Sequence, residues 1–272
     1  MRYGKFYGVG VGPGDPGLVT LKAVKCLQNA DVIFSAVSRQ GARSVSGNVV
    51  DSIPDIEAEC HELVFSMSKD WNERLACVKE NARLIADELE RGKNCAFTTI
   101  GDPMTYSTCG YLVKFLELML DDLRAEFIPG VNSWSALAAA SGRVLVEDCE
   151  RFTVQPNYID PDPETFKKAL ADGDTLVFLK TYRSRNKILD LLAEEVPDAK
   201  VTYGANIGLP EQFISKDPDK IRDRKDEYLS MLIVNTGKGC LPEKPGSEQG
   251  PANAGASPTE VSGCQVDFND KR

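Results

Sequence analysis

Histidine is nearly absent from this sequence, and its scarcity narrows the classes of catalytic site that can be built. The 272 residues include one histidine, His61. A hydrolase with a Ser-His or Cys-His pair would have to use that residue, and no G-x-S-x-G nucleophile elbow accompanies it. We interpret the acidic stretch from Glu57 to Glu62 as a loop, so we expect His61 to be a surface residue.

Paired cysteines and long apolar runs are lacking as well. None of the eight cysteines has C-x-x-C spacing, so no metal site is expected. Residues 1–5 lead straight into an apolar, glycine-punctuated segment, and we predict no signal peptide. We therefore expect reduced thiols and a cytoplasmic location. No stretch approaches the roughly 20 apolar residues of a membrane helix, so no membrane partner is expected.

Positive charge is in deficit. The chain has 41 acidic and 32 basic residues, which gives a formal net charge of −9. An acidic chain repels polyphosphate, so nucleic acid is not an expected partner. We interpret the acidity mainly as a contribution to solubility.

Apolar residues alternate between strand-like runs and helical stripes along most of the chain. Residues 6–11 predict a buried strand, residues 18–27 a helix and residues 31–35 a second strand, which is a βαβ opening. Residues 71–91 predict a long helix that Gly92 ends. Further helices are predicted at 111–120, 136–140, 164–171 and 186–195, and strands at 95–100, 126–128, 151–155, 175–180, 200–204 and 228–235. This alternation predicts an α/β fold with largely parallel sheets.

The composition divides the chain into three parts. We expect an N-terminal α/β domain at residues 1–120 and a C-terminal α/β domain with its own core at 121–238. After residue 239 Gly, Pro and Ser dominate, and the apolar periodicity ends. We predict a disordered tail at residues 239–272.

A glycine-rich turn follows the first predicted strand. The dinucleotide fingerprint G-x-G-x-x-G fits only from Gly12 through Gly14 and Gly17. Pro13 and Pro16 within it remove the backbone donors that a pyrophosphate needs. No acidic residue ends the second predicted strand to bind a ribose. The turn is therefore better suited to a ligand contacted through shape and carbonyls, although a plain strand-to-helix turn stays open as an interpretation.

A second turn, Gly101-Asp102-Pro103, ends the strand predicted at 95–100. Ligands bind at the carboxyl edge of open α/β sheets. Asp102 could cap the following helix, or it could bind or orient a ligand. Its turn is rich in hydroxyl groups, which come from Thr105, Ser107 and Thr108.

A third strand-end turn contains Pro129-Gly130 and leads to Asn132 and Ser133. Together the three turns resemble the motifs of the tetrapyrrole methylase family, in the family's order and at about its spacing, over roughly residues 4–238. The segment from Met104 to Thr108 and residues 179–183 are most similar to its precorrin-2 or cobalt-factor II C(20)-methyltransferase branch. Uroporphyrinogen methyltransferases usually carry a glycine where this chain has Ile100.

The resemblance implies a two-domain fold, each domain a parallel or mixed sheet flanked by helices, with S-adenosyl-L-methionine in the cleft between them. It implies C-methylation of carbon 20 of precorrin-2 or cobalt-precorrin-2, S-adenosyl-L-homocysteine as product, and a homodimer. The implied cofactor-binding residues are Pro13, Ile100, Gly101, Asp102, Thr105, Ser107, Thr108, Asn132, Ser133, Leu179, Gly208 and Met231.

The implied chemistry is a direct displacement, for which alignment and exclusion of water suffice. Asp102 is the candidate for electrostatic support of the sulfonium, and Tyr106 the candidate for contact with the tetrapyrrole. The substrate carries many carboxylates, and the basic residues Lys180, Arg183 and Arg185 are candidates to bind them. A solvated helix start is the alternative interpretation of these cations.

Other functions stay open at this point. Another corrinoid or uroporphyrinogen methyltransferase would share the same motifs. Diphthine synthase is a more distant relative that the 104–107 segment fits poorly. A nicotinamide-binding oxidoreductase is disfavoured by the proline-filled glycine turn. Turnover would distinguish an enzyme from a nucleotide-binding module, and the sequence does not decide whether the substrate carries cobalt.

Overall fold

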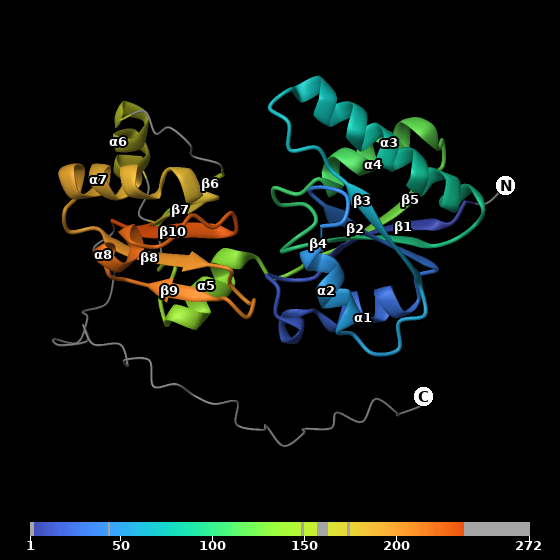
Figure 1. The fold of residues 1–272 in the computed structure, drawn as a ribbon, viewed down its shortest axis with the longest axis horizontal. Helices are drawn as coiled ribbons and strands as arrows, with labels where there is room; N and C mark the ends of the chain where they lie inside the picture. The colour runs from blue at the N-terminus through green and yellow to red at the C-terminus, as the bar shows by residue number, and fades with distance from the viewer. Residues whose placement is uncertain (1–2, 43, 148–149, 157–162, 173–174, 237–272) are drawn as a thin grey trace, which may run out of the picture. The chain divides into compact units, whose positions relative to one another are not determined.

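A computed structural model describes residues 3–42, 44–147, 150–156, 163–172 and 175–236 (Figure 1). Residues 1–238 form one compact unit. The tail predicted at 239–272 lies outside the described residues. Among the described residues, no helix is long and apolar enough to cross a membrane.

The first sheet contains five parallel strands. They are β1 (Lys5–Gly10), β2 (Val32–Val37), β3 (Glu59–Val64), β4 (Cys95–Thr99) and β5 (Arg124–Ile128). Their order across the sheet is β3-β2-β4-β1-β5, and every pairing is parallel. All five carboxyl ends therefore lie at one edge of the sheet.

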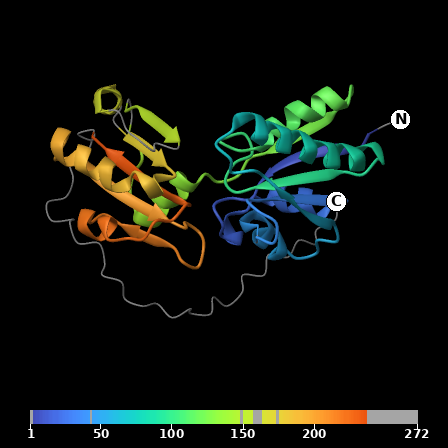
Figure 2. The same ribbon diagram turned by 45° about the horizontal axis from the view of Figure 1, so that its top comes forward.

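Four helices cover the two faces of this sheet, as the alternation of strand and helix requires. Helices α1 (Leu21–Gln28) and α2 (Val45–Asp51) cover one face, and α3 (Trp71–Glu90) and α4 (Cys109–Met119) cover the other. Figures 1 and 2 show these two layers, with the blue helices on one side and the teal and green helices on the other. Successive strand residues point to opposite faces, so each buried strand supplies both cores.

Each end of α3 has the capping group that the sequence pattern requires. Asp70 accepts a hydrogen bond from the Asn72 N–H at 2.8 Å at the start of the helix. Gly92 adopts a φ of 83° just after its end, which confirms the predicted C-terminal glycine.

The interpretation of residues 57–62 as a loop is wrong for residues 59–62, which belong to β3. Strand β3 is at the edge of the sheet, and only Leu63 among its residues is buried. Its polar composition therefore carried no apolar alternation that would reveal a strand. The expected surface position of His61 is confirmed, since its side chain is 45% exposed, with Nε2 2.9 Å from Glu59 Oε1.

The second sheet is mixed. Its order is β6-β7-β10-β8-β9. The strands are β6 (Phe152–Pro156), β7 (Thr175–Leu179), β8 (Lys200–Ala205), β9 (Phe213–Ser215) and β10 (Ser230–Asn235). β6 pairs with β7 in parallel, and the other three pairings are antiparallel. The sequence pattern did not predict the short strand β9.

Four helices pack against the second sheet. Helices α6 (Pro163–Asp172), α7 (Arg185–Glu195) and α8 (Pro218–Arg222) contribute to one core, and α5 (Ser133–Ser141) contributes to the other. The sequence analysis did not predict α8 or, on the first sheet, α2, because helices of five and seven residues have room for little periodicity. The α/β fold class itself is confirmed.

The first sheet extends beyond the expected domain boundary. Strand β5 pairs with β1, with Val9 opposite Ile128. A boundary between residues 120 and 121 would therefore assign β5 to the wrong sheet, although the residues after β5 do pack elsewhere. A boundary drawn by sheet membership lies after Ile128.

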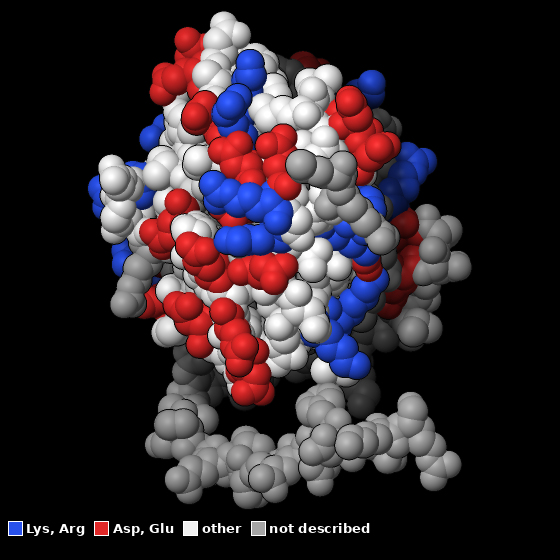
Figure 3. All heavy atoms as spheres, turned by 90° about the vertical axis from the view of Figure 1, so that its right-hand side faces the viewer, with Lys and Arg blue, Asp and Glu red and all other residues white. Residues whose placement is uncertain are grey.

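Charged side chains of both signs share the surface. On the face in Figure 3, Lys and Arg side chains lie between groups of Asp and Glu. One such cluster joins the first sheet to α1, where Glu126 pairs with Lys5 and Lys22, each at 2.6 Å. These two ammonium groups, Lys22 first, lower the pKa of Glu126 to about 2.

Candidate active site

Three loops meet at the carboxyl edge of the first sheet. They follow β1, β4 and β5, which are neighbours in the order β4-β1-β5. The Val11 N–H donates to the Thr99 carbonyl at 3.0 Å, and the Gly101 N–H donates to the Gly12 carbonyl at 2.7 Å. The loops after β1 and β4 thus stay hydrogen-bonded beyond the parallel strands, where Gly12 and Gly101 form an antiparallel bridge.

Glycines allow these loops to touch backbone to backbone, and we call Gly10, Gly101 and Gly130 the glycine junction. A Cβ added to Gly130 would lie 2.1 Å from the Gly101 carbonyl oxygen. A Cβ added to Gly10 would lie 2.4 Å from that oxygen and 2.7 Å from the Gly130 nitrogen. Both positions therefore exclude every side chain. Gly10 and Gly130 therefore serve the approach of the loops to each other.

The carboxylate of Asp102 organises two of the three loops. Its Oδ1 accepts hydrogen bonds from the Met104 N–H at 2.9 Å and from the Thr105 hydroxyl at 3.1 Å. Its Oδ2 accepts one from the Gly130 N–H at 3.2 Å. Helix α4 begins later, at Cys109, so the interpretation of Asp102 as its cap is wrong. The side chain is half-buried, and its negative charge stays beside the junction.

The other hydroxyls of this loop have structural partners. The Ser107 hydroxyl donates to Thr99 Oγ1 at 3.2 Å and accepts from the Cys109 N–H at 3.1 Å. Thr108 is the residue before α4 and makes no side-chain cap. Burial raises the pKa of the neighbouring Cys109 thiol to about 12, and the charge of Asp102 adds to the rise. That thiol is therefore protonated at neutral pH and is not a nucleophile.

Tyr106 has an unusual backbone and one polar partner. Its φ is 51°, in the left-handed region that costs an L residue roughly 1–2 kcal/mol. Its side chain is 53% exposed, and its hydroxyl donates to the Val154 carbonyl of β6 at 3.0 Å. Strained residues of this kind concentrate at functional sites. The exposed ring, rather than the occupied hydroxyl, is the part left for a ligand.

The glycine turn after β1 touches the loop that contains Gly208. Pro13 in this turn is buried. A Cβ on Gly14 would lie 2.6 Å from Leu209 Cδ2, and a Cβ on Gly208 would lie 2.8 Å from the Asp15 nitrogen. The structure thus brings Pro13 and Gly208 to adjacent segments, although 195 positions, 208 minus 13, separate them in the chain.

An apolar cluster unites the remaining predicted cofactor residues. Met231 lies opposite Leu179 in the β10–β7 pairing. Both belong to a cluster with Val131, which directly precedes Asn132 and Ser133 at the start of α5. The Asn132 side chain makes no capping hydrogen bond, so its amide is left for other partners.

The space beside Gly101 suits a ligand. A Cβ built on Gly101 would meet nothing closer than Asn132 Oδ1, at 3.9 Å. Ile100, which precedes it, packs against the core under α1 and α2. The open space thus has a polar amide and the Asp102 charge beside it. These are features that an organic cation with polar substituents would use.

The three residues of the predicted basic cluster, Lys180, Arg183 and Arg185, differ in their exposure to solvent. Arg183 is exposed and Lys180 half-buried at the end of β7. Arg185, in contrast, is 4% exposed. Its guanidinium donates to the carbonyls of Arg224 and Lys225, the latter at 3.3 Å. Arg185 therefore supports its own domain and is withdrawn as a candidate for substrate binding.

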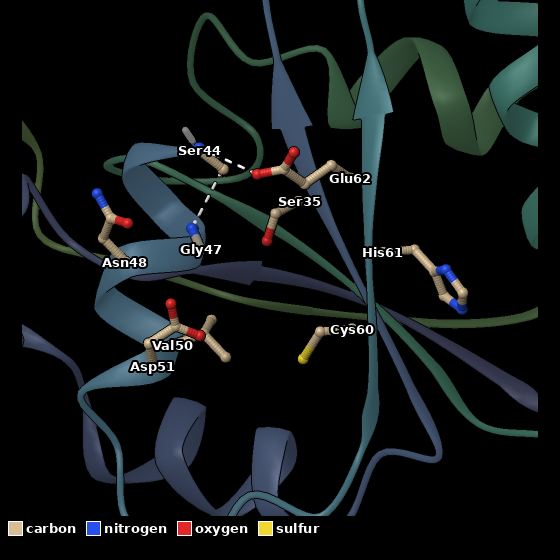
Figure 4. A pocket seen from close by; sticks show the side chains of 9 residues that line it. All are labelled: Ser35, Ser44, Gly47, Asn48, Val50, Asp51, Cys60, His61 and Glu62. Atoms are coloured by element: carbon tan, nitrogen blue, oxygen red, sulfur yellow. Dashed lines mark hydrogen bonds between the residues drawn. The ribbon is translucent and has the colours of Figure 1, made fainter. Parts of the chain in front are cut away.

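A separate pocket of about 380 Å³ lies between α2, β2 and β3 (Figure 4). Cys60 and Glu62 point into it from the edge strand, and the Ser44 N–H donates to Glu62 Oε1 at 3.3 Å. His61 points to the other face of β3 in Figure 4. None of the predicted site residues lines this pocket, and we do not assign the chemistry to it.

Several residues of the site were not predicted from the sequence. A glycine lies at the end of β1 and another just after β5. This recurrence was a signal that could have predicted the close approach of Gly10 and Gly130. Leu209 and Val154 carried no such signal, because their positions follow from contacts between segments that are distant in the chain.

The fold is an α/β fold in which three strand-end loops meet at one edge of a parallel sheet. The family model of the Tetrapyrrole (Corrin/Porphyrin) Methylases matches residues 5–218. The chain belongs to this family. The predicted resemblance is thereby confirmed.

Two relatives are similar along nearly their whole length. The probable cobalt-precorrin-2 C(20)-methyltransferase of Methanocaldococcus jannaschii is 32% identical over 234 residues, which are 86% of this chain and 97% of the relative. The precorrin-2 C(20)-methyltransferase of a Sinorhizobium species is 32% identical over 240 residues, or 85% of this chain and 95% of the relative.

A solved structure shares the fold. It is the uroporphyrin-III C-methyl transferase of Thermus thermophilus complexed with S-adenyl homocysteine. Its TM-score is 0.60 at 24% identity, with 85% of this chain and 92% of that chain covered. This likeness is one of fold.

Proposed function

We propose that this chain transfers a methyl group from S-adenosyl-L-methionine to carbon 20 of precorrin-2 or cobalt-precorrin-2, in cobalamin biosynthesis. The observation that carries the proposal is the similarity to C(20)-methyltransferases over 86% of this chain and 97% of a relative. The convergence of the three strand-end loops supports it, because these loops contain the motifs of the family.

The methyl donor fits the residues around the glycine junction. The space at Gly101 lies beside the Asn132 amide, and the half-buried Asp102 supplies a negative charge for a sulfonium. We propose that the donor is held by the set predicted above: Pro13, Ile100, Gly101, Asp102, Thr105, Ser107, Thr108, Asn132, Ser133, Leu179, Gly208 and Met231.

When bound, the donor supplies an activated methyl group that reacts by direct displacement. The chain then has to align the substrate carbon with that methyl group and exclude water. Asp102 is fixed for such a role by its three hydrogen bonds. The exposed ring of Tyr106 remains the candidate for contact with the tetrapyrrole. The proton that leaves afterwards passes to water or to a weak base.

A homodimer and a cytoplasmic location belong to the proposal as well. The family resemblance supports the dimer, and light scattering coupled to size exclusion tests it. The biosynthetic activity of the relatives supports the location, which cell fractionation tests.

Calorimetric titration with S-adenosyl-L-homocysteine, followed by methyl transfer to precorrin-2 with and without cobalt, tests the function. Binding followed by transfer supports the proposal, and the preferred metal state identifies the substrate form. Binding without transfer to either form contradicts the proposed substrate and leaves another methylase as the function. Absence of binding contradicts the whole proposal.

A further inference from the structure

Two cations flank a pair of aromatic rings near the carboxyl end of β7. The Lys180 ammonium lies over the Tyr228 ring, 5.6 Å from its centroid. The Tyr228 and Tyr182 ring centroids are 5.6 Å apart. The Arg183 guanidinium lies over the Tyr182 ring at 5.2 Å. We call Lys180, Tyr228, Tyr182 and Arg183 the cation–aromatic ladder.

The pairing of β7 with β10 builds this ladder. Leu179 lies opposite Met231, and the Lys180 N–H donates to the Ser230 carbonyl at 2.7 Å. Tyr228 precedes Ser230 by two positions, so this pairing places Lys180 beside Tyr228. The short helical turn Thr181–Arg183 then brings Tyr182 back toward the same ring.

Lys180 reaches its position at an energetic cost. Its φ of 58° and ψ of 45° are left-handed, which disfavours a residue with a side chain. A Gly or Asn would meet the backbone requirement with less strain. A residue held in this region is a candidate for a functional position.

Hydrogen bonds and an ion pair fix the segment that precedes Tyr228. Arg185 is buried and donates to the carbonyls of Arg224 and Lys225. Glu227, 8% exposed, pairs with Arg224 at 3.0 Å. These contacts fix the segment that contains Tyr228. Arg185 is therefore a positioning residue for the ladder.

The two cations of the ladder keep their charge available for a ligand. Within the part of the chain that the structure describes, no carboxylate pairs with Lys180 or Arg183. Aromatic faces hold both cations, and no acceptor among the described residues takes their side-chain N–H donors. On an acidic protein with a net charge of −9, two such cations at the ends of one aromatic pair are a local concentration of positive charge.

We propose that the cation–aromatic ladder binds two carboxylate groups on the rim of the tetrapyrrole substrate, one through Lys180 and one through Arg183. The inference rests on the proposed function for the identity of that substrate. Arg183 can hold a carboxylate bidentately, and the tyrosine rings keep both cations extended toward the ligand. The ladder acts in binding rather than in the displacement itself.

Variants in the ladder test this proposal through KM. Lys180→Met and Arg183→Gln are each expected to raise KM for the tetrapyrrole about tenfold with little change in kcat. Lys168→Met, a lysine on α6, and Arg74→Gln, whose guanidinium lies over Trp71, are the matched controls. The affinity for S-adenosyl-L-homocysteine should be the same in all four variants.

Tyr228 separates the ladder from a pair of independent charges. Tyr228→Phe keeps the ring and should stay within about twofold of the wild type. Tyr228→Leu removes the ring beneath Lys180 and should raise KM toward the value of Lys180→Met. A KM unchanged in Lys180→Met and Arg183→Gln, relative to their controls, overturns the proposal.

A second readout keeps this test separate from the test of function. Fluorescence titration with uroporphyrin, a stable polycarboxylate tetrapyrrole, needs no turnover. Weaker binding by the ladder variants than by the controls supports the ladder even where methyl transfer to carbon 20 fails. Absence of uroporphyrin binding by the wild type, or equal binding by all variants, overturns the ladder and leaves the methyltransferase function to its own assay.

Discussion

Asp102 and Gly130 join two strand-end loops that lie 28 positions apart in the chain. The Gly130 N–H donates to Asp102 Oδ2 at 3.2 Å, while Oδ1 accepts from Met104 and Thr105. One carboxylate therefore holds the loop after β4 in shape and ties it to the loop after β5. A substitution can therefore remove the charge and the bond to Gly130 while keeping the bonds to Met104 and Thr105.

Asp102→Ala is expected to lower both stability and methyl transfer. The Gly130 N–H loses its acceptor, which costs about 1–3 kcal/mol if that group stays buried. Loss of the charge should lower kcat/KM at least about tenfold. Asp102→Asn keeps an oxygen for Met104 and Thr105, and it removes the charge together with the acceptor for the Gly130 N–H. Urea unfolding and initial rates measure the two effects, and an unchanged rate in both variants would remove Asp102 from the site.

Gly130→Ala should disrupt the glycine junction. The new Cβ would lie 2.1 Å from the Gly101 carbonyl oxygen, so one loop has to move. We expect a loss of about 1–3 kcal/mol in the free energy of unfolding, together with weaker binding of S-adenosyl-L-homocysteine. Gly110→Ala is the control, because nothing lies within 4 Å of its Cβ in α4. It should stabilise the protein by about 0.4–1 kcal/mol. Equal stability of the two variants would contradict the packing at the junction.

Glu126 should make stability depend on pH in the acid range. Hydrogen bonds from Lys22 and Lys5 lower its pKa to about 2, from an ordinary 4.5. A lowered native pKa stabilises the fold above the ordinary value, and the contribution is lost as the pH falls toward 2. Glu126→Gln should therefore unfold more easily than wild type at pH 7, and the difference should shrink below pH 4.5. Glu80→Gln, an exposed glutamate on α3, is the control for urea unfolding across pH. A difference that persists unchanged at the lowest pH would show that Glu126 acts through packing.

Arg185 and Arg183 should separate stability from substrate binding. Arg185→Met leaves the carbonyls of Arg224 and Lys225 without their donor, and we expect a loss of about 1–3 kcal/mol. Arg183→Met removes an exposed side chain and should change stability by less than about 0.5 kcal/mol. Thermal and urea unfolding of the pair measures the contrast. A stable Arg185→Met variant with a raised KM would restore Arg185 to the substrate site.

Most of the fold could be predicted from the apolar pattern. Strands β1, β4 and β7 and helix α3 were expected within a few residues of their bounds, because each has a strong apolar run or stripe. Strand β3 could not be recognised, since an edge strand with one buried residue has the composition of a loop. Strand β5 was expected as a strand, and the structure pairs it with β1 in the first sheet. The sheet that a strand joins depends on its pairing partner, and the local sequence does not predict that partner.

The site was also predictable in part. The three turns were expected to carry the chemistry, and the glycines, Asp102 and Tyr106 all lie in them. The partners of these residues were not predictable, because the Gly130 amide, the Val154 carbonyl and Leu209 belong to other segments. Arg185 shows the same limit: its spacing matched Lys180 and Arg183, and only burial distinguished it.

The sequence by itself determined the strand-end turns, the α/β alternation and the family, because these depend on local residue types in a fixed order. The tertiary structure decided which backbones touch and which cations stay exposed. Close approach of Gly10, Gly101 and Gly130 requires three parallel strands to end at one edge. The ladder requires β7 and β10 to pair in one register. Both are consequences of long-range hydrogen bonding and packing, which bring distant parts of the chain together.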